Sequence, residues 1–164
     1  MIARLSKALL VLLVGLLLLL VGVDNIIDHQ SNFTSVQHVM AMDTVFPTTT
    51  LTWRAITSPL LQHLAYALII ACELVSGAAC AAGAVRLWNA RGAPAPRFNA
   101  AKDLAIAGLV GGFAIYLFFF LTIGGEWFQM WQSQTWNAQA SSFRFLASIG
   151  LVLLFLNQRD GDLA

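Results

Sequence analysis

The clearest structural signal in this chain is the stretch Leu104 to Ile123, LAIAGLVGGFAIYLFFFLTI, which contains no charged residue. A helix of this length crosses the hydrocarbon core of a bilayer. Three further apolar stretches flank it, and we expect membrane spans at residues 6–27, 59–88, 102–123 and 138–157. The sequence therefore predicts an all-α integral membrane protein with one domain, residues 1–164, whose four helices form an antiparallel bundle.

The composition agrees with a chain that lies mostly in lipid. Of 164 residues, 59% are hydrophobic and only 10% are charged, and the mean hydropathy is +0.75. The nine Lys and Arg residues are scattered singly, so no nucleic-acid partner is expected. Cys72 and Cys80 are separated by about 12 Å along a helix, too far for a disulfide, and no C-x-x-C motif indicates a metal site.

The first apolar segment has two interpretations. Arg4 and Lys7 precede the run from Ala8 to Val23, and a secretory signal begins in the same way. No A-x-A-like cleavage site follows within residues 21–28, and Ile26 and Ile27 extend the run to spanning length. We therefore predict an uncleaved helix.

The distribution of cations predicts the orientation, because Lys and Arg are retained on the cytoplasmic side. Only Arg54 and Arg144 fall on one side of the predicted spans. The cations on the other side are Arg4, Lys7, Arg86, Arg91, Arg97, Lys102 and Arg159. We therefore expect an inner-membrane protein with both termini in the cytoplasm. Small residues at 76–83 and the pair Gly108 and Gly112 are expected to let helices approach closely.

The two outer connections carry four of the five tryptophans, Trp53, Trp127, Trp131 and Trp136. Such residues normally form an aromatic belt at headgroup level. Residues 126–133 place apolar and polar side chains on opposite faces of a helix, which predicts a short helix lying flat on the membrane after a turn at Gly124 and Gly125. A second short interfacial helix is predicted over residues 35–42.

Most polar side chains also lie in these outer connections. They are Asp24, Asn25, Asp28, His29, His38, Asp43, Arg54, Glu126, Asn137 and Arg144. One interpretation is structural: Arg54 and Arg144 pair with Asp43 or Glu126 and fix the loops. The other is a binding site made by Arg54, Asp43, Glu126, Trp127, Trp131 and Arg144 for a lipid headgroup, a carboxylate or a quinone ring.

Glu73 is the most unusual residue within a predicted span. It lies roughly 20 Å along the helix from Pro59, near the middle of the bilayer, where a carboxylate is costly. His63 and Tyr66 share its helical flank, so the three residues are predicted to line a polar track. The alternative is a structural hydrogen bond from Glu73 across the bundle, to Tyr116 or Ser148.

No cofactor or metal is expected. A haem between spans normally needs two histidines in the membrane, and only His63 lies in a span. His29, His38, Asp28 and Asp43 lack the close spacing of metal ligands, and no nucleophile motif is present.

Four strings in the outer connections carry a family resemblance. They are HVMAMDTVFP at residues 38–47, WRAI at 53–56, IGGEWFQMWQS at 123–133 and WN-x-Q at 136–139. The chain resembles a bacterial family of predicted small integral membrane proteins of unknown function. The resemblance implies four transmembrane helices in the inner membrane and supplies no activity, cofactor or catalytic residue.

Three functions stay open at this point. The leading one is an accessory or interaction subunit, which binds lipid and offers an ordered outer surface to a larger membrane complex or to another copy of itself. The second is an oligomeric proton-coupled carrier or channel that uses Glu73 and His63, although four helices enclose little volume. The third is a membrane enzyme component that binds a quinone or a lipid headgroup.

Overall fold

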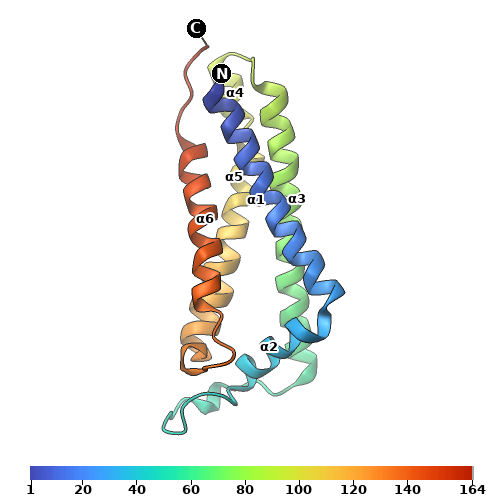
Figure 1. Ribbon diagram of the computed structural model, residues 1–164, viewed down its shortest axis with the longest axis vertical. Coiled ribbons are helices and arrows are strands. Elements are labelled where there is room, and N and C mark those ends of the chain that lie inside the picture. The colour runs from blue at the N-terminus through green and yellow to red at the C-terminus, as the bar shows by residue number, and fades with distance from the viewer. Residues whose placement is uncertain (164) are drawn as a thin grey trace.

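The structure, a computed structural model, describes residues 1–163, which are mostly helical and contain no strand. The elements are α1 (Ile2–Ile27), α2 (His29–Ala41), η1 (Thr52–Arg54), α3 (Pro59–Ala90), α4 (Ala95–Ala100), α5 (Asp103–Ala114), η2 (Ile115–Trp127), η3 (Met130–Gln132) and α6 (Gln139–Asn157). Figure 1 shows an elongated molecule with both termini at one end, called here the terminal end, and α2 at the opposite end. The all-α prediction is confirmed.

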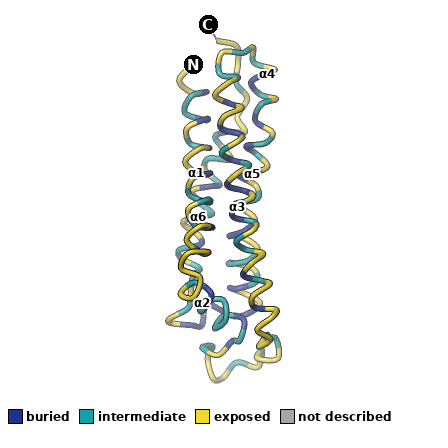
Figure 2. The backbone as a smooth tube through the Cα atoms, turned by 90° about the vertical axis from the view of Figure 1, so that its right-hand side faces the viewer, coloured by how far each residue is buried: buried dark blue, intermediate teal, exposed yellow. Residues whose placement is uncertain are grey.

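Four helices are long and apolar enough to cross a membrane, as predicted. They cover Ile2–Ile27, Pro59–Ala90, Ala95–Trp127 and Gln139–Asn157, the third being made of α4, α5 and η2 in sequence. The third helix extends beyond both ends of the predicted span 102–123. Many residues on the outward faces of these helices are exposed and many that face other helices are buried (Figure 2), as expected where lipid is the surrounding solvent.

The second half of the third helix is a π-helix, η2, which the sequence did not reveal. Its wider turn is visible where the helix ends, because the backbone N–H of Phe128 donates to the carbonyl oxygen of Ile123, five residues earlier, at 2.9 Å. The predicted turn at Gly124 and Gly125 is wrong, because both glycines are buried within η2. A Cβ on Gly125 would collide with the side chain of Gln139 on α6, so glycine allows this close approach.

The predicted flat helix over residues 126–133 is also wrong. Gln129 has a φ of 57°, which breaks the helix and leaves only the short turn η3 beyond it. This reversal buries Met130 and Gln132 against the protein instead of leaving an apolar face on the membrane. The helix predicted at residues 35–42 exists as α2, but it begins at His29, one residue after α1, and ends at Ala41. Met42, which follows it, has a φ of 52°.

Glycine contacts hold α1, α3 and α5 together in the terminal half of the molecule. A Cβ added to Gly83 on α3 would lie 2.6 Å from the Cα of Ala105 on α5. One added to Gly108 would lie 2.6 Å from the backbone nitrogen of Cys80. The predicted small-residue faces therefore meet each other, and backbones approach without intervening side chains.

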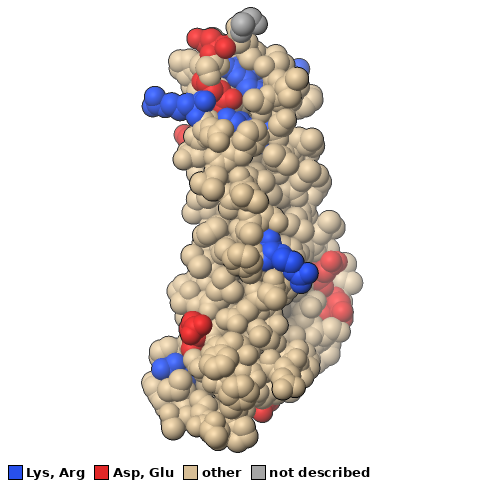
Figure 3. Space-filling view, turned by 60° about the vertical axis from the view of Figure 1, so that its left-hand side comes forward, with Lys and Arg blue, Asp and Glu red and all other residues tan. Residues whose placement is uncertain are grey.

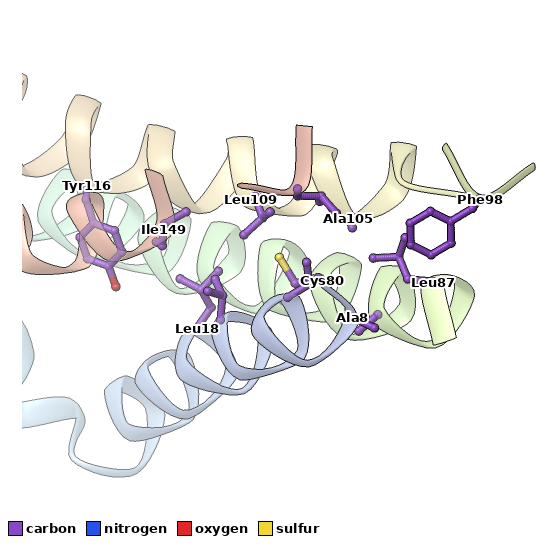
Figure 4. Packing of buried hydrophobic residues seen from close by; sticks show 13 residues of the cluster. Ala8, Leu18, Cys80, Leu87, Phe98, Ala105, Leu109, Tyr116 and Ile149 are labelled. Atoms are coloured by element: carbon purple, nitrogen blue, oxygen red, sulfur yellow. The ribbon is translucent and has the colours of Figure 1, made fainter. Parts of the chain in front are cut away.

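The apolar core fills the space beside these contacts. Val11, Leu18, Cys80, Leu109 and Ile149 are fully buried, with 0% exposure. They come from α1, α3, α5 and α6, and Figure 4 shows Leu18, Cys80, Leu109 and Ile149 gathered between these helices. Both cysteines are free, and Cys80 packs as a hydrophobic residue.

Three buried cations tie the chain ends together at the terminal end. Arg4, Lys7 and Lys102 are each at most 3% exposed. Lys7 Nζ and Lys102 Nζ both lie 2.6 Å from Asp160 Oδ2, in the tail that follows α6. Charged side chains gather at this end of the face shown in Figure 3. We call these four residues the terminal clamp.

Arg4 completes the terminal clamp by binding backbone carbonyls. Its Nη1 donates to the carbonyl oxygens of Arg91 and Ala93 at 3.0 and 2.6 Å, and its Nη2 donates to that of Gly161 at 2.7 Å. Its guanidinium also lies 4.6 Å from the centre of the Phe98 ring. The first helix, the connection between the second and third spans, and the C-terminal tail are thus joined by one cation.

The carboxyl of Asp160 is held in its charged form. Burial alone would raise its pKa, but hydrogen bonds from Lys102 and Lys7 outweigh burial and bring the pKa below its usual range. A lowered pKa stabilises the fold above the pKa of the unfolded chain, and this stabilisation is lost as the pH falls through the folded-state value. The contribution of the clamp is therefore complete above about pH 4 and decreases in more acidic solution.

Replacing Gly83 by alanine should destabilise the protein. The added Cβ must displace the backbone of Ala105, which costs about 2–3 kcal/mol and exceeds the roughly 1 kcal/mol gained from the better helix propensity of alanine. Thermal unfolding in detergent measures the difference. Gly92→Ala is the matched control, because nothing lies within 4 Å of its added Cβ. Equal melting temperatures for the two variants would contradict the close contact.

Asp160→Asn should lower the free energy of unfolding by about 3–5 kcal/mol at pH 7, because it leaves two buried ammonium groups without their counter-ion. The exposed Asp103→Asn serves as control, and denaturant titration in detergent gives the values. The difference between wild type and Asp160→Asn should shrink as the pH falls below about 4. A difference independent of pH would show that the charge of Asp160 is not what stabilises the clamp.

Candidate functional site

A large apolar pocket lies in the half of the molecule next to α2. Its volume is about 580 Å³, within the range of roughly 300–1,000 Å³ that ligand pockets have. No charged residue lines it. Its walls come from α2, α3, η2 and the connection that follows η2, and its lining includes Val36, Val39, Met40, Ala65, Leu68, Ile69, Phe118, Phe119, Phe120, Ile123, Trp127 and Trp136.

The pocket exists because small residues give way to large ones along the third helix. Gly108 and Gly112 bring α5 close to its neighbours, whereas Phe118, Phe119 and Phe120 follow in η2. Figure 1 shows α3 and the third helix diverging toward the end that carries α2. The space between them is covered at that end by α2 rather than filled by a fifth helix.

The segments that cover the α2 end of the pocket form an ordered cap, called here the platform (residues 29–58 and 128–138). Its small core contains Met40, Met42 and Phe128. Hydrogen bonds join its two segments: Thr44 Oγ1 donates to Ser133 Oγ at 2.9 Å, and the backbone N–H of Phe46 donates to Gln132 Oε1 at 2.8 Å. The loops are therefore held in one arrangement.

Arg54 lies directly beside the pocket wall. Its guanidinium is 4.6 Å from the ring centre of Trp127, which lines the pocket, and 5.4 Å from that of Trp53. Its Nη1 donates to the carbonyl oxygen of Trp127 at 3.3 Å, and its Nε is buried without a hydrogen-bond partner. Aromatic faces, rather than a carboxylate, hold this cation.

The predicted ion pairs between the outer arginines and acids are wrong. Asp43 pairs with His38, whose Nδ1 is 2.8 Å from Asp43 Oδ2, and the ring of His38 stacks on Trp136 at 4.6 Å. Within residues 1–163 no ion pair involves Arg54 or Arg144. His38 precedes Asp43 by five residues. Arg54, the last residue of η1 in the same connection, is held instead by the rings of Trp53 and Trp127.

The predicted binding set converges only in part. Arg54 and Trp127 are brought together, whereas Trp131 packs edge-on against Phe46 and does not line the pocket. Glu126 is exposed, and no hydrogen bond of the described residues reaches its carboxylate. Arg144 lines a separate recess on α6 together with Leu17 and Ser148. The two arginines therefore do not share one site.

Two of the three residues of the predicted polar track, Glu73 and Tyr66, belong to one hydrogen-bonded cluster. Glu73 is 1% exposed, and Asn25 Nδ2 on α1 donates to its Oε2 at 2.8 Å. Tyr66 donates from its hydroxyl to the carbonyl oxygen of the same Asn25 at 2.7 Å. His63 is exposed and stacks on Phe33 at 4.0 Å, outside this hydrogen-bonded cluster.

The predicted partners of Glu73 are wrong, although a cross-bundle hydrogen bond exists. The hydroxyl of Tyr116 is buried and has no partner in the described chain, and Ser148 donates to the carbonyl oxygen of Arg144 on its own helix. Asn25 takes their place because α1 packs along α3, whereas Ser148 lies on α6. Within residues 1–163 no group of three His, Cys, Asp or Glu side chains is placed to hold a metal ion.

Of the residues that line the pocket, the predicted binding set contained only Trp127. Val36, Val39 and Met40 have the spacing of one apolar face of a helix, which was a usable signal for the inner side of α2. The three consecutive phenylalanines gave no such signal, since a π-helix cannot be recognised from their pattern. Asn25 was noted only as an outer polar residue.

Four long apolar helices with many exposed apolar side chains are typical of a multi-pass integral membrane protein. Over residues 3–159 the chain matches the family described as predicted small integral membrane protein (DUF2165), and it belongs to that family. The resemblance noted in the outer connections is thereby confirmed. Comparisons with curated proteins and with solved structures find no significant match.

Asn25→Leu should destabilise the protein by about 1–3 kcal/mol, because the Glu73 carboxyl loses its donor while it stays buried. Thermal unfolding in detergent provides the measurement, with the exposed Asn89→Leu on α3 as control. The double variant Asn25→Leu/Glu73→Leu should recover much of the loss, since it removes both polar groups. Additive losses in the double variant would argue against a direct bond.

Proposed function

We propose that this protein is a non-enzymatic accessory protein of the membrane that uses the platform as its interaction surface. The observation that carries the proposal is the ordered platform, whose two segments are joined by side-chain hydrogen bonds across a core of their own. A surface held in one arrangement loses little entropy when it binds a partner.

Exposed aromatic residues on and beside the platform support the same proposal. Trp53 is 70% exposed, and Phe46, Trp127 and Trp131 are each 43–46% exposed. Trp and Phe are enriched in protein interfaces, and Trp also anchors proteins at the headgroup level of a membrane. The partner is a larger membrane complex or a second copy of the chain, in addition to the bilayer itself.

The carrier function is less well supported by the packing. A proton route through Glu73 to the terminal end would have to cross the layer of Leu18, Cys80, Leu109 and Ile149, all of which are fully buried and apolar. Glu73 is also held by Asn25, and His63 lies in an aromatic stack. These contacts favour a structural role for the polar cluster.

The enzyme function lacks convergent groups. A catalytic site needs an acid or base within reach of a second polar group and a substrate. Asp43 is engaged by His38, and Glu126 and Arg144 lie outside the pocket lining. What remains of this alternative is binding of a lipid or quinone beside Arg54 and Trp127.

The proposed orientation places both termini in the cytoplasm of a bacterial cell and the platform on the outer face of the inner membrane. The Lys and Arg residues other than Arg54 and Arg144 belong to segments at the terminal end of the molecule. These segments are the N-terminal part of α1, the region around Arg91 and Arg97 that joins α3 to α5, and the tail. With this orientation Trp53 and Trp127 lie at the outer headgroup level.

Site-specific photo-crosslinking in living cells tests the proposal. A photoreactive residue in place of Trp53 or Phe46 should give the same protein adduct, identified by mass spectrometry as a complex subunit or a second copy. The control position is Leu151 on α6, which is equally exposed, at 69%, but faces lipid far from the platform. Adducts of equal yield at Leu151, or none at either platform position, would contradict the proposal.

A further inference from the structure

We propose that the pocket under the platform binds one acyl chain of an anionic phospholipid whose phosphate lies against Arg54. The inference deepens the proposed function by naming a lipid ligand for the platform. It does not depend on a protein partner, because the pocket and the cation are both present in the isolated chain.

The pocket is open to the side of the molecule that faces lipid. Leu68 on α3 and Phe118 on η2 both line it, and they are 51% and 53% exposed. These two residues therefore form the rim of a lateral opening between α3 and η2. A chain from the surrounding leaflet reaches the pocket through this opening without crossing a polar layer.

The lining requires an apolar occupant. An unfilled space of about 580 Å³ would forfeit the dispersion contacts of its walls, and no charged side chain is present to hold water there. Flexible methylene chains fill irregular apolar space at membrane depth, and they surround the protein at high concentration. The acyl chain of a phospholipid is therefore the occupant with the lowest cost of entry.

Arg54 selects the headgroup. The residue is flanked by two that line the pocket: Trp127, which its guanidinium covers at 4.6 Å, and Ile56, which follows two residues later in the chain. Of its five N–H donors only one, on Nη1, makes a hydrogen bond within residues 1–163, and no carboxylate pairs with it. A phosphate accepts two parallel hydrogen bonds from such a guanidinium.

The same charge argues against a quinone as the occupant. A quinone has a long apolar chain but a neutral head, which leaves the cation of Arg54 without a counter-ion. An anionic phospholipid satisfies both the apolar pocket and the cation.

Native mass spectrometry of the purified full-length protein tests the inference. Phosphatidylglycerol and phosphatidylcholine with identical acyl chains are titrated separately, and the fraction of protein carrying one lipid is measured. Both lipids offer a phosphate to Arg54, but the trimethylammonium group of phosphatidylcholine repels the guanidinium, so wild type should bind phosphatidylglycerol about tenfold more tightly. Arg54→Ala should abolish this preference, whereas Arg144→Ala, which removes the other outer arginine outside the pocket, should preserve it.

A variant that fills the pocket measures the contribution of the acyl chain to binding separately from that of the headgroup. Ala65→Phe places a ring in the pocket and should weaken binding of both lipids by about tenfold, whereas Leu151→Phe on the exposed face of α6 should have no effect. Phosphatidylglycerol with a brominated acyl chain gives a second measurement, which does not depend on the pocket-filling variant. It should quench tryptophan fluorescence at low lipid fraction. The double variant Trp127→Phe/Trp136→Phe, which removes both tryptophans of the lining, should abolish this saturable part, whereas Trp88→Phe should not.

Each contrary result overturns the inference. Equal binding of the two lipids, or equal effects of Arg54→Ala and Arg144→Ala, would remove the headgroup site. Unchanged binding by a folded Ala65→Phe, together with equal quenching in both tryptophan variants, would place the bound lipid elsewhere on the protein. Tighter binding of a quinone than of phosphatidylglycerol in the same assay would assign the pocket to the quinone. Loss of lipid selectivity would leave the crosslinking result at Trp53 and Phe46 intact, so the two proposals fail separately.

Discussion

Close contact between glycine-bearing helix faces is the constraint on which the rest of this structure depends. Gly83 lies against Ala105, and Gly108 lies against Cys80, so α3 and α5 touch through their backbones in the terminal half. Helices that meet without side chains between them at one end must diverge where Phe118 to Phe120 follow in sequence. The apolar pocket is the space that this divergence leaves, and α2 and the platform cover it.

Polar groups mark the two ends of this tight region in different ways. At the terminal end, Arg4, Lys7, Lys102 and Asp160 are buried together and neutralise one another only in part, so Arg4 also needs backbone carbonyls and the face of Phe98. In the other half, Asn25 satisfies both Glu73 and Tyr66. In both places a costly buried charge or carboxyl is retained by specific partners from another part of the chain.

The candidate site was recognisable from the sequence only in fragments. Arg54 and Trp127 were predicted to take part, because lone cations and tryptophans next to membrane spans are informative. Asp43, Glu126, Trp131 and Arg144 carried the same kind of signal, yet they do not join the pocket. Proximity in a loop sequence does not fix which side chains meet, since Gln129 and Met42 in left-handed conformation redirect the chain.

Hydrophobic length and composition by themselves determined that this is an all-α protein with four membrane-capable helices, because a chain in lipid must satisfy its backbone hydrogen bonds internally. The small residues at 76–83 and 108–112 also predicted close contacts between helices. Only the tertiary structure decided that α5 continues as a π-helix, that Asn25 is the partner of Glu73, and that buried cations hold the tail. These features depend on which helix faces pack together. The free energy that favours one packing comes from contacts between residues distant in sequence, and a local sequence pattern does not show these contacts.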